Sequence, residues 1–207
     1  MKYRRNGQSQ VMTKDEIKRV IQFQQNSRHS IRNICLVSFS FLTGCRVGEI
    51  SKLKLQDVVN EDWTIKNITV LRKEYTKTNQ TRVIYLVDEK LRKSLNRYIT
   101  HRRETEKLEP TKICFEKPLF ISQKNGGFTP RTLQRLYKNM YRAVGLDEMV
   151  SSHSGRRTYI CNLISSGIDM KTVSTLAGHS TIQTTVDTYA IPNPNKLENV
   201  SRNLNIF

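Results

Sequence analysis

Residues 31–42 are apolar on nearly every side of a helix, and no other segment restricts the fold as strongly. A helix of this kind is stable only when other elements cover it all round, so the sequence predicts a central buried helix. Gly44 follows the segment and predicts its end, because glycine readily adopts the left-handed conformation that closes a helix. The remaining elements must therefore supply the layers around this helix.

Helix signals elsewhere in the chain predict those layers. A capping box at residues 13–16 opens one helix, and the segment 88–106 predicts a long charged helix with an aspartate cap. A threonine followed by proline begins the segment 129–144, which predicts a further helix. A short helix is expected over residues 46–53, and three or four short helices are expected after residue 151.

The strand signals are fewer. Two β-rich runs at residues 64–71 and 82–87, joined by the polar segment 73–81, predict a hairpin with a long loop. Residues 118–122 predict a short strand that ends at the turn of residues 124–127. The expected fold class is therefore α+β, mostly helical, with a small antiparallel β-sheet or hairpin.

We expect three parts along the 207 residues, a length that suits one domain with a substantial core. Residues 1–11 are expected to be a polar leader or linker stub, residues 12–190 to form one domain, and residues 191–207 to form a tail helix. The tail follows a proline-rich break, and its apolar residues recur at helical spacing: Leu197, Val200, Leu204 and Phe207.

The formal net charge of +17 indicates a polyanionic partner, of which nucleic acid is the commonest, although a merely solvated basic surface remains an alternative. No apolar run reaches the roughly 18 residues that a membrane span needs. The four cysteines form no CxxC pair, which favours a reduced, cytoplasmic compartment and disfavours structural zinc.

Three cationic residues, in two segments, are unusual for a plain fold. Arg46 follows directly after the end of the apolar helix, and a cation held against a core needs a partner, for which Glu49 is the structural alternative. His153 and Arg156 share a helical stripe with Ile160, so they are expected to face inward into a cleft that receives an anion. The alternative is a helix start whose histidine and arginine meet solvent.

Two further residues are weak signals alone. His179 follows a glycine that ends a helix, and Tyr189 lies on an apolar stripe with Ile182 and Val186. A histidine after a glycine cap is usually a turn residue, and a tyrosine on such a stripe usually belongs to the core.

Taken together, these segments resemble one family. Residues 43–50 (TGCRVGEI) resemble the first signature box of the tyrosine recombinases, the phage integrase family. Residues 153–157 (HSGRR), 176–180 (LAGHS) and 184–189 (TTVDTY) resemble the second box, in order and at the family's spacing. Residues 77–86 are similar to the hairpin that carries the family's catalytic lysine. The resemblance covers about residues 12–195.

The resemblance implies a site-specific DNA recombinase of the integrase type, with a tyrosine-recombinase catalytic domain. Its implied catalytic residues are Arg46, Lys77, His153, Arg156, His179 and Tyr189. The two arginines would clamp one DNA phosphate, and the tyrosine would attack it to form a 3′-phosphotyrosyl link. The lysine would protonate the leaving 5′-oxygen. His153 would accept a proton from the reacting phosphate or hydrogen-bond to it, and His179 would donate a hydrogen bond to it.

The family needs no metal and no nucleotide cofactor, so neither is expected. The implied partners are double-stranded DNA and further copies of the chain, assembled as a homotetramer on DNA, with no membrane. The implied setting is the cytoplasm of a prokaryote, on DNA, with the chain encoded by a phage or another mobile genetic element. In this family the tail typically packs on the neighbouring protomer, and a tail that folds back on its own domain is the alternative.

Three different functions also fit some of these features. A type IB topoisomerase shares the chemistry, a catalytically silent DNA-binding protein shares the fold, and a module for RNA or phosphoproteins rests on charge alone. Lys73 competes with Lys77 as general acid. Because no clamp domain precedes residue 12, the chain resembles either a fragment of a longer integrase or a short member such as the fimbrial-switch inverting recombinases. The candidate DNA readers, which would otherwise be solvated faces, are Arg131, Arg135 and Lys138 on one helix and Arg92 and Arg97 on another.

Overall fold

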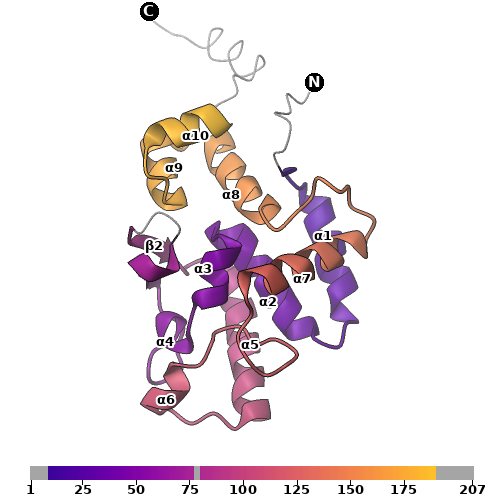
Figure 1. The fold of residues 1–207 in the computed structure, drawn as a ribbon, viewed down its shortest axis with the longest axis vertical. Coiled ribbons are helices and arrows are strands. Elements are labelled where there is room, and N and C mark those ends of the chain that lie inside the picture. The colour runs from indigo at the N-terminus through magenta and orange to yellow at the C-terminus, as the bar shows by residue number, and fades with distance from the viewer. Residues whose placement is uncertain (1–8, 77–79, 190–207) are drawn as a thin grey trace, which may run out of the picture.

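The apolar helix predicted at residues 31–42 is α2 (Ser30–Thr43), and it runs through the centre of the fold in the computed structural model (Figure 1). The structure describes residues 9–76 and 80–189. α2 packs against α1 (Lys14–Gln25), α5 (Glu89–Glu106) and α8 (Ser154–Ser165). It ends at Gly44 in the left-handed conformation, with φ +62°, as predicted. The central buried helix is confirmed.

The other helices surround this centre. The short elements are α3 (Val47–Lys52), α4 (Leu55–Val58), the 3₁₀ turn η1 (Lys73–Tyr75) and α6 (Lys112–Phe115). The longer ones are α7 (Pro130–Arg142), α9 (Met170–Ala177) and α10 (Ile182–Tyr189). In Figure 1, α8, α9 and α10 form a layer over the end of α2. The predicted helices that fall within the described residues are confirmed, whereas α4 and α6, each a single turn, were not predicted. The predicted tail helix at residues 191–207 lies outside the described residues.

Local capping explains where the helices begin. Thr13 and Glu16 form the predicted capping box of α1, and the side chains of Asp88 and Thr129 cap α5 and α7. Each of these side chains accepts a hydrogen bond from a backbone N–H that lacks a partner within its helix. These helix starts follow from short-range chemistry.

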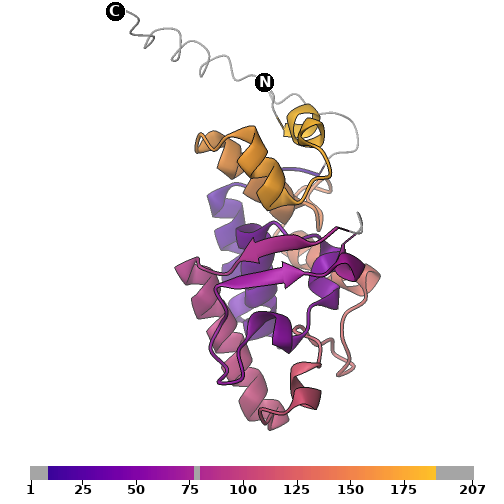
Figure 2. The same ribbon diagram turned by 90° about the vertical axis from the view of Figure 1, so that its left-hand side faces the viewer.

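The hairpin is present and shorter than predicted. β1 (Ile68–Leu71) pairs antiparallel with β2 (Arg82–Tyr85), and Figure 2 shows both strands lying across the side of the helical body. Residues alternate between exposed and buried along each strand. The cross-strand pairs Thr69–Ile84 and Leu71–Arg82 therefore face inward, so an arginine stands where an apolar residue is usual.

The strand predicted at residues 118–122 is wrong. This segment makes only isolated bridges, one from Pro118 to Lys54 and one from Ile121 to Gly127. Arginine side chains occupy its carbonyls instead: Arg102 donates to Pro118 at 2.6 Å and to Leu119 at 3.0 Å, and Arg32 donates to Ile121 at 3.1 Å. With side chains as partners, the backbone does not form a ladder.

Two hydrophobic clusters divide the molecule. The large one lies around α2, and the small one is built from Ile160, Val173 and Ala177 in α8 and α9. The two parts approach each other closely at Gly155, where an added Cβ would lie 2.2 Å from Ser40 Oγ on α2. That contact explains a glycine at the start of α8, where a helix former would otherwise be more stable.

Candidate active site

Arg46 and Glu49 form the base of the candidate site. Arg46 is the N-cap of α3, and its Nη1 donates to Glu49 Oε1 at 2.9 Å while its backbone N–H donates to Oε2 at 2.7 Å. The structural pair left open by the sequence is therefore present. The Glu49 side chain is 1% exposed and that of Arg46 is 22% exposed, so part of the Arg46 guanidinium reaches solvent.

A second arginine shares this carboxylate. Arg82 Nη1 donates to Glu49 Oε2 at 2.9 Å, so one carboxylate serves two guanidinium groups. Sequence reasoning missed Arg82 although a signal exists. Arg82, Ile84 and Leu86 are every second residue of the predicted strand, and this spacing places Arg82 on the same buried face as the two apolar residues.

Arg156 supplies the third guanidinium. It is 6% exposed, and it donates from Nη1 to Gly44 O at 2.9 Å and from Nη2 to Ala177 O at 2.6 Å. It therefore joins the C-terminal ends of α2 and α9. Burial, followed by the nearby Arg46 and Arg82, lowers the pKa of Arg156 to about 9. Burial is the largest cause of this lowering, and the two neighbouring guanidinium groups add to it.

His179 and Tyr189 lie beside these arginines. The imidazole Nδ1 of His179 is 2.7 Å from Thr185 Oγ1. The rings of His179 and Tyr189 are nearly parallel, with centroids 6.0 Å apart and an interplanar angle of 13°. The histidine after the glycine cap and the tyrosine on the apolar stripe thus meet, although ten residues separate them in the sequence.

The arginines shift the pKa of both groups. Burial, and then Arg156, Arg46 and Arg82, lower the pKa of His179 to about 4, so its imidazole is neutral at pH 7. Burial raises the pKa of Tyr189, and this outweighs the lowering by Arg156 and Arg46. The Tyr189 hydroxyl therefore keeps its proton at neutral pH.

The other predicted site residues are His153 and Lys77, with Lys73 as the competitor of Lys77. His153 is the N-cap of α8 and is exposed, so the prediction that it faces inward beside Arg156 is wrong. Its backbone is still helical, with φ −84° and ψ −12°, but no burial accompanies the helical spacing at this N-cap position of α8. Lys77 lies outside the described residues, and Lys73 is exposed in η1.

The candidate DNA readers separate into two groups. Arg131, Arg135 and Lys138 are exposed on α7, and Arg97 is exposed on α5. Arg92 has a structural role instead, because its guanidinium donates to three backbone carbonyls and one side-chain amide oxygen around the hairpin.

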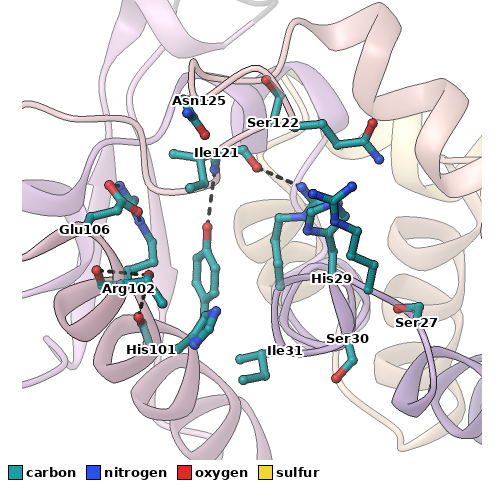
Figure 3. Close-up of a pocket in the computed structure, with 15 residues that line it drawn as sticks. Ser27, His29, Ser30, Ile31, His101, Arg102, Glu106, Ile121, Ser122 and Asn125 are labelled. Atoms are coloured by element: carbon teal, nitrogen blue, oxygen red, sulfur yellow. Dashed lines mark hydrogen bonds and ion pairs between the residues drawn. The ribbon is translucent and has the colours of Figure 1, made fainter.

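A pocket of ≈ 300 Å³ lies apart from this site, between the α1–α2 connection, α5 and residues 121–125 (Figure 3). It is rich in cationic side chains. However, Arg102 donates to Glu106, and Arg32 donates to the carbonyl of Ile121. Because these two arginines already have partners within the protein, we assign the pocket no ligand.

Within residues 9–76 and 80–189, no three His, Cys, Asp or Glu side chains gather so as to hold a metal ion. All four cysteines are free. In the same described part of the chain, no helix combines the length and the apolar character needed to cross a bilayer.

Comparison with known sequences decides the family. The sequence pattern that defines the phage integrase family matches residues 10–196. This chain belongs to the phage integrase family. Family relatives include tyrosine recombinase XerD of Rickettsia conorii, 28% identical over 185 residues, and XerD of Oceanobacillus iheyensis, 23% identical over 175 residues. Tyrosine recombinase XerC of Staphylococcus epidermidis is 26% identical over 163 residues.

These matches span most of this chain and about half of each relative. They cover 87%, 84% and 78% of the chain and 59%, 55% and 50% of the respective relatives. Solved structures confirm the fold class. The crystal structure of XerA recombinase has a TM-score of 0.72 at 22% identity, covering 98% of this chain and 68% of that one. The Tn1549 transposon integrase in complex with a circular intermediate DNA has a TM-score of 0.74 at 16% identity, covering 96% and 67%.

Proposed function

We propose that this chain is the catalytic part of a site-specific DNA recombinase that cleaves and rejoins strands through a 3′-phosphotyrosyl intermediate. One observation carries the proposal: two arginines, a neutral histidine and a tyrosine from distant segments converge in one place (Arg46, Arg156, His179 and Tyr189). Membership of the phage integrase family supports it, and the relatives named above are tyrosine recombinases.

Arg46 and Arg156 are proposed to bind the two non-bridging oxygens of the scissile phosphate. Guanidinium groups present paired donors in a plane and suit this geometry. Charge builds on these oxygens as the phosphorus becomes pentacoordinate, so donors held in advance lower the barrier. Burial lowers the pKa of Arg156 most, and the nearby Arg46 and Arg82 lower it further; the charge of these neighbouring arginines supports an anionic ligand here.

Tyr189 is proposed as the nucleophile. Its Oη attacks the phosphorus and gives up its proton to a phosphate oxygen, the bond from phosphorus to the 5′-oxygen breaks, and a 3′-phosphotyrosyl link remains on one strand end. The free 5′-hydroxyl of another strand then reverses the step and releases the tyrosine. Because each step replaces one phosphate ester by another, rejoining needs no nucleotide.

Proton transfers complete the cycle. Lys77 is proposed to donate a proton to the leaving 5′-oxygen, and Lys73 is the competing candidate. His153 is proposed to accept a proton from the reacting phosphate or to hydrogen-bond to it, which suits its exposed position. His179 is proposed to donate from Nε2 to a phosphate oxygen, with Nδ1 accepting from the Thr185 hydroxyl at 2.7 Å.

Double-stranded DNA is the proposed substrate, and the active assembly is proposed to be a homotetramer. The net charge of +17 supports a polyanionic partner. The exposed basic residues of α7, Arg131, Arg135 and Lys138, are the proposed DNA contacts of that helix. Exchange of the tail between protomers concerns residues 191–207, which lie outside the described residues.

Covalent trapping tests the reaction class. The probe is a pool of nicked duplexes taken from the DNA that flanks the gene, designed so that cleavage releases a short strand which diffuses away. Without a 5′-hydroxyl to reverse the step, the protein stays attached to DNA and survives denaturant. We expect an adduct with the wild type, none with Tyr189→Phe, and an adduct with Tyr85→Phe, a control at an exposed tyrosine.

Each result has a clear meaning. An adduct that persists in Tyr189→Phe would refute the nucleophile, and binding of every duplex without an adduct would favour the silent DNA-binding alternative. Relaxation of a supercoiled plasmid by monomeric protein, with no strand exchange between two duplexes, would favour the topoisomerase alternative.

A further inference from the structure

Arg82 is the least exposed of the three clustered arginines, and every nitrogen of its guanidinium is engaged. Its side chain is 3% exposed. Besides the bond to Glu49, Nη2 donates to Thr43 O at 2.9 Å and Nε donates to Leu176 O at 3.0 Å. A group with this burial and three protein acceptors is not free to bind a phosphate. Any effect of Arg82 on the reaction must pass through its neighbours.

Those neighbours belong to three different elements. Thr43 is the last residue of α2, Glu49 lies in α3, and Leu176 lies in the last turn of α9. The large hydrophobic cluster surrounds α2 and α3, whereas α9 belongs to the small one. Arg82 therefore ties the two clusters together at the point where they meet.

The chain also makes room for this arginine. Gly178 ends α9 with φ +63°, and an added Cβ there would lie 2.3 Å from Arg82 Cδ. The glycine before His179 thus serves two purposes, since it adopts the left-handed conformation and leaves space for the Arg82 side chain. The carbonyl of the same glycine lies 3.4 Å from Arg46 Nη2. Arg82 and Arg46 therefore both contact the turn at Gly178.

We propose that Arg82 is a positioning residue for the reaction. It holds Glu49 and the end of α9 in place, so that Arg46 and His179 keep their positions relative to each other. The inference rests on the proposed function. Glu49 accepts hydrogen bonds from both Arg82 and Arg46. Without Arg82, Arg46 becomes the only guanidinium paired with this carboxylate, and the stronger pairing draws Arg46 away from a phosphate. Loss of Arg82 also removes the donor to the carbonyl of Leu176 in α9, three residues before His179.

The test compares Arg82→Gln with Arg102→Gln. Arg102 is a matched control, because it is also a buried arginine that bonds one glutamate and two backbone carbonyls, and it lies beside the pocket of Figure 3. Both variants are measured at a temperature where unfolding scans show them folded. We expect Arg82→Gln to slow adduct formation roughly 10- to 100-fold and Arg102→Gln to leave it within about twofold.

A methylphosphonate at the scissile position separates positioning from a general loss of stability. Replacing one non-bridging oxygen by methyl removes the phosphate charge that Arg46 and Arg156 are proposed to bind. In the wild type this replacement should slow cleavage strongly, and in Arg82→Gln the additional slowing should be roughly tenfold smaller, because the clamp is already displaced. Equal slowing in both proteins would overturn the proposal.

One more variant and one more modified substrate sharpen the result. Arg82→Lys should behave like Arg82→Gln, because an ammonium cannot reach three acceptors in different directions. A bridging 5′-sulfur makes the leaving group independent of a general acid, so restoration of Arg82→Gln by that substrate would place Arg82 with the acid and refute a role through Arg46.

Failure of the proposed function gives a different result. If the wild type forms no adduct, the recombinase proposal fails, and inorganic phosphate becomes the probe of the clamp. Phosphate should then raise the melting temperature of the wild type and of Arg102→Gln more than that of Arg82→Gln, at constant ionic strength. Equal rises would overturn the positioning role.

Discussion

Glu49→Gln should be the most destabilising single isosteric change in the site. The carboxylate accepts from Arg46 Nη1 at 2.9 Å, from Arg82 Nη1 at 2.9 Å and from the Arg46 backbone N–H at 2.7 Å, and it is 1% exposed. An amide offers one acceptor and one donor group, so its NH₂ must point at a guanidinium or a backbone N–H. The cluster of three arginines then loses the carboxylate that pairs with Arg46 and Arg82.

The expected cost follows from these contacts. Breaking a buried ion pair by removing one partner costs about 3–5 kcal/mol. In a protein of this size 1 kcal/mol shifts the melting temperature by about 2–4 °C, so Glu49→Gln should melt roughly 6–20 °C below the wild type. Thermal and urea unfolding at pH 7 and constant salt measure both quantities.

Glu106→Gln is the matched control. Glu106 also pairs with a buried arginine, Arg102, but its side chain is 24% exposed, so solvent can replace part of what is lost. We expect it to lose about 1–2 kcal/mol. If Glu49→Gln proves no more destabilising than Glu106→Gln, Glu49 is not the counter-charge that holds the arginine cluster together, and the reasoning fails.

Three further changes have defined outcomes. Gly155→Ala should cost about 1–3 kcal/mol in urea unfolding because its Cβ meets Ser40, and a cost below 0.5 kcal/mol, about the limit for an unstrained site, would contradict that contact. The pKa of His179, lowered to about 4, means that the unfolded chain takes up a proton near pH 6.5 while the folded one does not. Stability should therefore be full above pH 6.5 and fall towards pH 4, less steeply in His179→Gln, and an imidazole NMR titration with a midpoint above 6 would rule this out. Arg131→Ala should weaken DNA binding and reduce the salt slope by about one, whereas Arg92→Ala should lower stability and leave the slope unchanged.

The parts of the fold that sequence predicts well depend on local chemistry. The caps at Thr13, Asp88 and Thr129 each involve a side chain and a backbone N–H three residues away, and the apolar run of α2 allows only a buried position. Neither signal requires knowledge of the rest of the molecule.

The failures arise where long-range partners decide the outcome. Residues 118–122 have strand-like composition, yet Arg102 and Arg32 from distant helices take their carbonyls. His153 shares the helical spacing of Arg156, yet its side chain is exposed, because spacing along one helix does not tell whether other elements cover its start. Arg82 alternates with exposed residues along β2, so it shares the buried face with Ile84. This alternation predicts a buried arginine only once the buried face of the hairpin is known.

The charge of the site suits a singly charged ligand. The three guanidinium groups of Arg46, Arg82 and Arg156 against the carboxylate of Glu49 leave two positive charges, since His179 is neutral. The arginines donate to carbonyls at the ends of α2 and α9, and each helix end carries about half a negative charge. About one positive charge remains, which matches the single charge of the phosphodiester proposed as substrate. These carbonyls also explain how three arginines stay close together without an anionic ligand, because the ends of the two helices accept hydrogen bonds from them.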